Sequence, residues 1–460
     1  MTKVKTDTSV NIRELVLGII IEVLEQEQYS SAVIGNTLKN YQYLEKQDRA
    51  FLSRLSEGII ERAIELDYFI NLFSKVKTNK MKPIIRNLLR MGVYQIKYME
   101  QVPDSAACNE AVKLAKKKGF QTLSGFVNGI LRNVSRNLDQ IQYPLEEKEP
   151  KRYLSILYSM PEWLIEHWMR EFPYETVKCI VEASLEEKPL SIRGNLEKTT
   201  MVELEKMLTN EEIQVQPGHY LTNARIIGGY NYLNKVKAFQ DGYFQVQDES
   251  SMLVAQVAGI KENDYIIDVC AAPGGKSLHA AELLKGTGLV SARDLTEHKV
   301  SLIQDNMKRL GYHNIEAIVQ DATKLREEDR GKADIVFADL PCSGLGVIGK
   351  KPDIKYKMSQ EQMDSLAKLQ RDILSVVQEY VKEDGVLIYS TCTINYKENL
   401  ENVKWFASEF SFELEDINPY LPDSLYQDST QNGYLQLVQG IHQTDGFFLA
   451  RLRKRKVGNK

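Results

Sequence analysis

The 460-residue sequence predicts a multidomain protein of the α plus α/β class. Residues 1–140 carry apolar side chains at three- and four-residue spacing, which is typical of amphipathic helices. Residues 241–460 alternate short apolar runs with helical stretches, which is typical of a mostly parallel, doubly wound sheet. Between them, residues 141–240 read as a polar linker followed by a small α+β domain. The sequence therefore predicts three domains.

The first domain is expected to be entirely helical. Its expected helices cover residues 11–25, 46–73, 82–98, 105–118 and 123–137. Pro83 suits the first turn of a helix, and Gly119 suits a helix end after three lysines that complement the helix dipole.

The first domain is also basic. Residues 1–140 hold 21 Lys and Arg against 15 Asp and Glu, so they carry a net charge of +6 within a total of −4. This distribution favours a polyanion-binding module, although an ordinary scatter of surface charge would give a similar pattern. A basic face is expected from Lys116, Lys117, Lys118, Arg86, Arg90, Arg132 and Arg136.

The middle domain begins after a linker at residues 141–152, which contains two prolines. A helix is expected from Pro161, a strand over 189–195, a second helix over 199–208 and short strands within 214–239. These elements predict a small α+β fold.

The last domain alternates strands and helices. The expected strands cover residues 265–269, 288–293, 315–319, 333–338, 385–389, 412–416 and 447–452. The expected helices cover 251–257, 277–284, 297–310, 359–381 and 399–410. Ligands bind at the carboxyl ends of the strands in such sheets, so this edge is where a site is expected.

A glycine turn follows the first of these strands, at Pro273-Gly274-Gly275. A strand, a glycine turn and a helix N-terminus together bring backbone N–H groups toward a polar ligand. The pattern lacks the spacing of a phosphate loop and of a dinucleotide-binding fold. Taken alone, it is equally typical of a tight connection between a strand and a helix.

Four acidic residues end four neighbouring strands: Asp268, Asp294, Asp321 and Asp339. A single Asp in this position is more often a turn former or a helix cap. Asp294 lies 26 residues after Asp268, near the position where nucleotide folds place the acid that binds ribose hydroxyls. Asp321 is suited to accept a hydrogen bond from an adenine amino group.

The five cysteines lie at 108, 179, 270, 342 and 392 and form no C-x-x-C pair. This pattern disfavours a disulfide framework and a zinc site, and it favours reduced thiols in the cytoplasm. The sequence contains no run of 18 or more apolar residues, so it predicts no membrane span.

Cys342 and Cys392 follow two adjacent expected strands, so both thiols should meet at the ligand-binding edge. A free cysteine is usually a small buried hydrophobe, but a nearby cation such as Lys276 would favour the thiolate. A thiolate that adds to carbon 6 of a pyrimidine activates carbon 5 for attack on an electrophilic methyl group. A carboxylate such as Asp339 near ring nitrogen 3 would stabilise that adduct.

Three motifs together resemble the RNA cytosine-C5 methyltransferases that use S-adenosylmethionine. They are DVCAAPGGK at 268–276, DLPCS at 339–343 and TC at 391–392. The resemblance implies a Rossmann-like class I methyltransferase fold for residues 241–460. The helical residues 1–140 resemble the NusB-type RNA-binding domain. Both parts on one chain resemble the bacterial RsmB/Sun family, which methylates small-subunit ribosomal RNA.

The resemblance implies roles for individual residues. Cys392 would be the nucleophile, Cys342 would help to release the product, and Lys276 and Asp339 would support the chemistry. Asp294 would bind the cofactor ribose, Asp321 its adenine, and Asp339 would border both the cofactor and the target base. The methionine end of the cofactor would lie against Cys270, Ala271, Ala272, Pro273, Gly274, Gly275 and Lys276.

The resemblance also implies a substrate, which would be cytosine 967 of 16S rRNA. The RNA would be free or in an early assembly intermediate, and the enzyme would be a cytoplasmic monomer without a metal or a membrane partner. The same chemistry on tRNA or DNA stays open, as does a non-catalytic RNA-binding factor for ribosome assembly. The glycine pattern disfavours a dinucleotide-dependent oxidoreductase.

Overall fold

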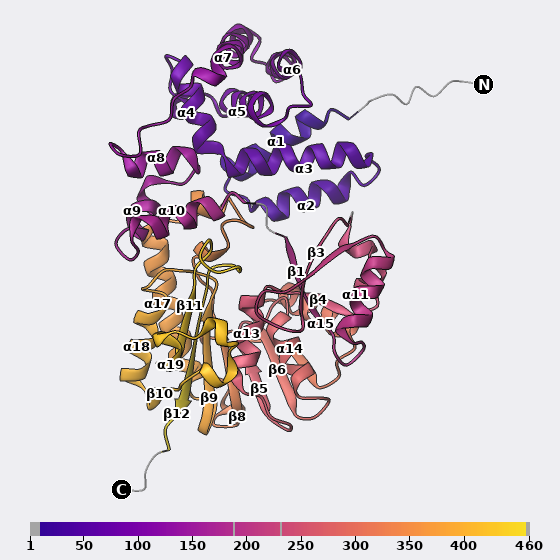
Figure 1. Ribbon diagram of the computed structural model, residues 1–460, viewed down its shortest axis with the longest axis vertical. Coiled ribbons are helices and arrows are strands. Elements are labelled where there is room, and N and C mark those ends of the chain that lie inside the picture. The colour runs from indigo at the N-terminus through magenta and orange to yellow at the C-terminus, as the bar shows by residue number, and fades with distance from the viewer. Residues whose placement is uncertain (1–9, 187–188, 231, 457–460) are drawn as a thin grey trace, which may run out of the picture. The chain divides into compact units, whose positions relative to one another are not determined.

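The protein is represented by a computed structural model that describes residues 10–186, 189–230 and 232–456 (Figure 1). The chain forms two compact units. The first, here called the helical unit, contains the residues up to Glu186 together with Ile348–Lys357. The second, here called the sheet unit, contains Glu187–Val347 and Met358–Lys460.

The described part of the helical unit is built from helices. They are α1 (Ile12–Leu24), α2 (Ser30–Asn40), α3 (Lys46–Glu61), α4 (Ala63–Phe73), α5 (Pro83–Tyr98), α6 (Asp104–Lys117), α7 (Ser124–Asn137), α8 (Pro150–Leu157), α9 (Glu162–Trp168), α10 (Tyr174–Ala183) and the short α16 (Ile354–Lys357). Apolar side chains of α1 to α7 form one core, in which Ile20, Leu55 and Leu88 are fully buried. This core confirms the expected helical front end.

Four features of the helical unit differ from the sequence prediction. Helix α8 begins inside the expected linker over 141–152, and helix α10 was not predicted. The expected helix over 46–73 is two helices, because the backbone leaves the helical conformation at Arg62. Helix α2 was not predicted. Its first residue, Ser30, donates from its N–H and its hydroxyl to the carboxylate of Asp353. A helix start that is capped from so far along the chain leaves no local sequence signal.

The sheet unit begins with a small antiparallel sheet. Its strands are β1 (Leu190–Gly194), β2 (Gln214–Pro217), β3 (Ala224–Gly228) and β4 (Phe244–Val246), in the order β2-β3-β1-β4. The sheet unit also contains α11 (Met201–Asn210) and α12 (Lys237–Gln240). Leu204 and Leu208 of α11 pack against Ile192 and Phe244 of this sheet. The expected small α+β fold is confirmed.

The rest of the sheet unit is an eight-stranded sheet. Its strands are β5 (Tyr265–Asp268), β6 (Leu289–Asp294), β7 (Ile315–Val319), β8 (Ala333–Asp339), β9 (Val381–Thr391), β10 (Phe412–Leu414), β11 (Tyr434–Leu437) and β12 (Phe447–Lys454). The order is β10-β12-β9-β8-β5-β6-β7, with β11 also paired to β12. The five strands from β9 to β7 pair in parallel, and the pairs that involve β12 are antiparallel. The expected mostly parallel sheet is confirmed.

Helices cover both faces of the large sheet (Figure 1). They are α13 (Glu249–Ala258), α14 (Gly275–Leu283), α15 (Glu297–Leu310), α17 (Gln360–Val377), α18 (Leu400–Glu409) and α19 (Asp428–Gln431). Ile266 of β5 joins a core with α13, α14 and α15, while the next residue, Ile267, joins a second core with α17 and α18. Alternate residues of a strand point to opposite faces, so each buried strand serves two cores.

Candidate active site at the carboxyl ends of the parallel strands

The four acids lie at one edge of the large sheet. Asp268, Asp294 and Asp339 are the last residues of β5, β6 and β8, and Asp321 follows β7 by two residues. Because these strands are parallel neighbours, their carboxyl ends meet at the same edge. The expected gathering of these acids is therefore confirmed.

The glycine turn after β5 is tight. Gly274 has φ of 105° and is the N-cap of α14, and a Cβ there would lie 3.2 Å from the side chain of Leu278. A residue with a side chain would be strained in this conformation. The N–H of Ala271 donates to the carbonyl of Arg293 at 2.8 Å, which fixes the turn beside β6.

The remaining residues of the turn present several chemical groups. Cys270 and Ala272 are half-buried and Pro273 is exposed. Burial raises the pKa of the Cys270 thiol, so this cysteine stays protonated. Gly275 opens α14 and its position borders the side chain of Gln247.

Asp294 has one oxygen engaged with the glycine turn and the other with its own loop. Its Oδ2 accepts from the N–H of Ala272 at 3.0 Å, and its Oδ1 accepts from the N–H of Leu295 at 2.8 Å. Lys299 Nζ lies 2.9 Å from Oδ1. These donors hold the carboxylate rigidly at the end of β6.

Asp268 and Asp321 differ sharply in environment. Asp268 is buried, and burial raises its pKa to about 7 although the Ser277 hydroxyl donates to it. The side chain of Asp321 is 32% exposed. Its Oδ1 accepts from the hydroxyl and the N–H of Thr323, and these bonds lower its pKa. Asp321 is therefore an ionised acceptor that a solvent-borne ligand can reach.

Lys276 and Asp339 form an ion pair at the centre of the edge. Lys276 Nζ lies 2.7 Å from Asp339 Oδ2, and the hydroxyl of Ser390 donates to Oδ1 at 2.7 Å. Burial alone would lower the pKa of Lys276, but the Asp339 carboxylate outweighs this effect and the pKa is raised. The Cys392 thiolate contributes in the same direction, so the Lys276 ammonium and the Cys392 sulfur favour opposite charges.

The two thiols meet at this edge, as the sequence predicted. Cys342 Sγ and Cys392 Sγ lie 3.3 Å apart, and both side chains are half-buried. The hydrogen bond to Cys392 and burial raise the pKa of Cys342 well above its usual value. Either sulfur could donate in this contact, and the raised pKa favours the protonated form of Cys342.

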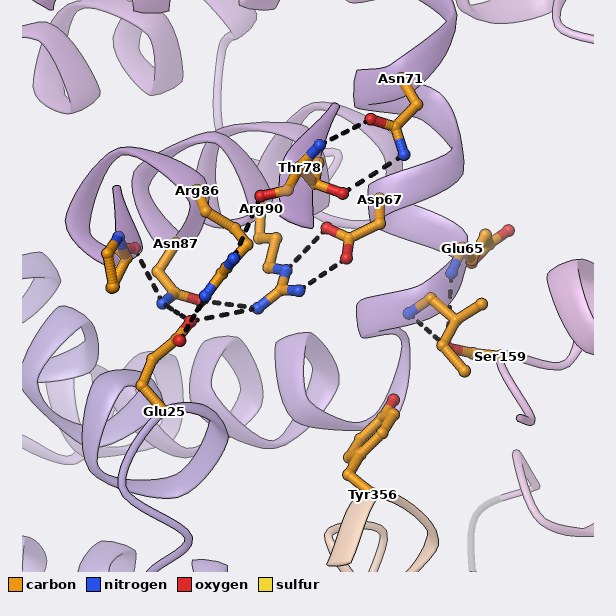
Figure 2. Close-up of polar contacts among 12 residues, drawn as sticks. Glu25, Glu65, Asp67, Asn71, Thr78, Arg86, Asn87, Arg90, Ser159 and Tyr356 are labelled. Carbon is orange, nitrogen blue, oxygen red and sulfur yellow. Dashed lines mark hydrogen bonds and ion pairs between the residues drawn. The ribbon is translucent and has the colours of Figure 1, made fainter. Parts of the chain in front are cut away.

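The expected basic face is wrong at two of its residues. Figure 2 shows that Arg86 and Arg90 of α5 point toward Glu25 and Asp67. Arg90 donates to both oxygens of Asp67, at 2.8 and 2.6 Å, and it is 9% exposed. These arginines are cross-links within the helical unit, because the acids that neutralise them come from α4 and from the end of α1. Lys116, Lys117, Lys118, Arg132 and Arg136 are exposed, although Lys117 and Lys118 pair with Glu14.

Three side chains that contribute to the site were missed. Ser390 precedes Thr391-Cys392 and pairs with Asp339 across β8 and β9, so strand register could have found it. Gln247 and Glu398 lie far in sequence from the residues they contact, and no spacing rule marks them. Among the described residues, no cluster of three or more His, Cys, Asp or Glu could hold a metal ion. Within the same ranges, no helix is both long and apolar enough to cross a membrane.

Three families match successive parts of the chain. The NusB family matches residues 10–136, a ferredoxin-like domain of RsmF/B-like methyltransferases matches 160–229, and the 16S rRNA methyltransferase RsmB/F family matches 255–453. Among solved structures, NSun6 from Pyrococcus horikoshii with SFG is 26% identical, with a TM-score of 0.59 over 65% of this chain and all of that one. A structure titled PH0851 has a TM-score of 0.80 at 24% identity and shares the fold over 98% of this chain and all of that one.

Curated relatives match nearly the whole chain. A probable ribosomal RNA small subunit methyltransferase B from Bacillus subtilis is 36% identical over 97% of this chain and 99% of its own length. A protein of the same name from Synechocystis is 30% identical over 97% of this chain and all of its own length. The chain therefore belongs to the ribosomal RNA small subunit methyltransferase B family, whose members have an S-adenosylmethionine-dependent methyltransferase fold.

Proposed function

We propose that the protein transfers a methyl group from S-adenosylmethionine to carbon 5 of a cytosine in 16S rRNA, through a covalent bond between Cys392 and carbon 6. The contact between Cys342 and Cys392 beside the Lys276–Asp339 pair is the observation that supports this most strongly. The names of the relatives supply small-subunit rRNA as the substrate class. The family resemblance supplies cytosine 967 as the target.

The residues at the strand ends suit the cofactor. Asp294 and Asp321 offer carboxylate oxygens to ribose hydroxyls and to an adenine amino group. Gln247 Nε2 is buried beside Gly275 and, among the described residues, has no acceptor, so it suits an anionic group such as a carboxylate. The cofactor, when bound, supplies an electrophilic methyl group. Cys270, Ala271, Ala272, Pro273, Gly274, Gly275 and Lys276 would line its methionine end.

The two cysteines divide the covalent chemistry. Cys392 forms a bond from sulfur to carbon 6, and the electron pair of the 5,6 double bond becomes available at carbon 5. Carbon 5 then takes the methyl group as the bond between that methyl group and the cofactor sulfur breaks, and the electron pair of that bond stays on the sulfur, which leaves as a neutral thioether. Loss of the carbon 5 proton to a base restores the double bond and expels the Cys392 thiolate, a step in which Cys342 assists. Lys276 stabilises the thiolate, and Asp339 holds the proton at ring nitrogen 3 of the adduct.

The substrate must present its base outside a helix, because a stacked base cannot offer carbon 6 to a thiol. We assign RNA binding to residues 1–140, support of the RNA to 141–240 and catalysis to 241–460. The RNA would be free or in an early assembly intermediate, and the enzyme would act as a cytoplasmic monomer.

Two variants test this proposal. Cys392→Ala should abolish methyl transfer to 16S rRNA fragments and retain cofactor binding, measured with radiolabelled cofactor and by calorimetry. Cys342→Ala should accumulate protein covalently attached to RNA, seen as a shifted band on a denaturing gel. Normal turnover by Cys392→Ala would refute the assigned nucleophile. If the wild-type protein methylates tRNA faster than 16S rRNA, then tRNA and not 16S rRNA is the substrate.

A further inference from the structure

A buried carboxylate behind the two cysteines has no part in the chemistry above. Glu398 is fully buried between β9 and α18. Its Oε2 accepts from the N–H of Ser343 at 2.9 Å and from Gln370 Nε2 at 3.0 Å. Its Oε1 accepts from the hydroxyl of Ser343 and from Asn395 Nδ2. Burial raises the pKa of Glu398, but the hydrogen bonds from Ser343, Asn395 and Gln370 oppose this rise, and four donors around two oxygens match an ionised carboxylate.

These contacts hold the chain on both sides of Cys342. The N–H of Ser343, the residue after Cys342, is bound by Glu398 itself. The carbonyl of Pro341, the residue before Cys342, accepts at 2.9 Å from the same Gln370 amide that donates to Glu398. Cys342 therefore has little freedom to move away from Cys392.

Asn399, the residue after Glu398, holds the two sequence neighbours of Cys392. The Thr391 hydroxyl donates to Asn399 Oδ1, and Asn399 Nδ2 donates to the carbonyl of Thr393 at 2.9 Å. The Thr393 hydroxyl in turn lies 2.8 Å from the hydroxyl of Ser343. The pair Glu398-Asn399 thus fixes both cysteine-bearing loops to one another.

The Glu398 charge also acts on Cys342 directly. It is among the causes that raise the pKa of Cys342, after the hydrogen bond to Cys392 and burial. The other ionisable groups that act on or respond to this thiol are Cys392, which follows β9, and Tyr389 of β9. The Lys276 ammonium interacts electrostatically with Cys392.

We propose that Glu398 is the positioning residue that decides which cysteine attacks. Its carboxylate anchors the Cys342 loop and places a fixed negative charge there, so Cys342 holds the proton and donates to Cys392. The roles of the two cysteines rest on the proposed function, but the difference in thiol reactivity does not. Without the Glu398 contacts, either sulfur could attack carbon 6 of the base.

Alkylation of the full-length protein by iodoacetamide tests this inference without RNA. Peptide mass spectrometry between pH 6 and 10 should show that Cys392 is labelled at least tenfold faster than Cys342. In Glu398→Gln the pH at which Cys342 is half-labelled should fall. The labelling ratio, meaning the rate for Cys392 divided by the rate for Cys342, should fall at least fivefold. Methyl transfer should fall at least tenfold, and Glu398→Asp should restore the labelling ratio in part because it keeps the charge.

Glu249→Gln is the matched control. Glu249 is also buried, and it accepts from the backbone N–H groups of His219, Tyr220 and Leu221, far along the chain from both cysteines. The Glu249→Gln variant should have a lower melting temperature but the same labelling ratio as the wild-type protein. If Glu398→Gln fails to fold, Ser343→Ala removes one anchor and should lower the ratio about threefold. An unchanged ratio in the folded variants, or an equal change in Glu249→Gln, would overturn the proposal. If the ratio shifts as expected but no RNA adduct forms, the proposed function fails and this inference stands.

Discussion

The helical unit and the sheet unit each contain a cluster of paired charges, but the two clusters differ in which groups donate to the acid and in where the acid lies in the fold. In the helical unit, a single guanidinium, that of Arg90, donates to both oxygens of Asp67 and also to Asn87 (Figure 2). In the sheet unit, Asp339 has one donor on each oxygen and its side chain remains 26% exposed. The Arg90–Asp67 pair joins α5 to α4, whereas the Asp339 carboxylate lies at the carboxyl end of a parallel strand, where sheets of this kind bind ligands.

This difference shows that charge in a sequence does not identify a binding surface. Arg86 and Arg90 lie on a basic, amphipathic helix, yet their partners make them structural. Lys276 has an acid partner as well, but its pair lies at the edge where five parallel strands end. Four predictions test whether the distinction holds.

The largest effect is expected at Lys276. Lys276→Met should lower turnover by about 10²- to 10³-fold, the usual cost of removing one preorganised charge that stabilises a reacting group. Asp339 would lose its ion pair, and the Cys392 thiolate would lose the cation that favours it. Turnover should be measured at saturating cofactor and RNA. Lys285→Met, which removes an exposed lysine of the same unit, should leave turnover within twofold.

At Arg90 a substitution is expected to change the free energy of unfolding by about as much as the Lys276 substitution changes the activation free energy of turnover. Arg90→Met should lower the free energy of unfolding by about 3 kcal/mol, because it leaves the Asp67 carboxylate without its ion-pair partner. Chemical denaturation followed by circular dichroism measures this, with exposed Arg136→Met as the control. A stable Arg90→Met protein with weakened RNA binding would show instead that this arginine belongs to an RNA-binding surface.

The pH dependence of stability should have opposite signs in the two units. The pKa of Asp268 is raised to about 7, so between about pH 4 and pH 7 the folded protein binds more protons than the unfolded chain. Its contribution to stability is therefore lost as pH rises, by at most about 1.4 kcal/mol per pH unit. Asp353 is the reverse case. Burial would raise its pKa, but hydrogen bonds from Lys357 and Ser30 lower it, so its contribution is lost as pH falls below about 4.

Melting temperatures of the cofactor-free protein from pH 3 to pH 8 test these signs. Asp268→Asn should flatten the decline between pH 5 and pH 8, whereas Asp353→Asn should not affect that range. A wild-type profile that rises through this range and is unchanged in Asp268→Asn would contradict the assigned environment of Asp268.

Much of the fold could be predicted because its signals are local. Helix α15 and strand β7 have the predicted bounds, since the Thr296 side chain caps the start of the helix and Gly311 ends it in the left-handed conformation. The strand-end acids and the two thiols were also predictable, because parallel strands bring their carboxyl ends together whatever the loops do. The helix caps depend on residues within a few positions of one another, and the meeting of the acids and thiols depends only on the strands being parallel neighbours.

The features that escaped prediction depend on partners far along the chain. Helix α2 begins at a cap supplied by Asp353, and the arginines of α5 are neutralised by Glu25 and Asp67. Glu398 acts through Ser343 and Gln370, which come from two other elements. Its sequence context, in a polar stretch before α18, resembles that of an ordinary exposed glutamate. Packing alone makes it a buried anchor.

The smallest effect is expected on the exposed part of the helical unit. Arg132 and Arg136 of α7 are exposed, whereas Lys117 and Lys118 already pair with Glu14. If the helical unit binds RNA through α7, the double variant Arg132→Gln, Arg136→Gln should weaken RNA binding about three- to tenfold. The number of counterions released on binding, read from the slope of log affinity against log salt concentration, should fall by about one or two. The double variant Lys117→Gln, Lys118→Gln removes the same charge but should weaken binding less, because Glu14 loses its partners at the same time. Filter binding at several salt concentrations measures both. Equal losses would mean that net charge alone attracts the RNA, whether or not the basic side chain is paired with an acid.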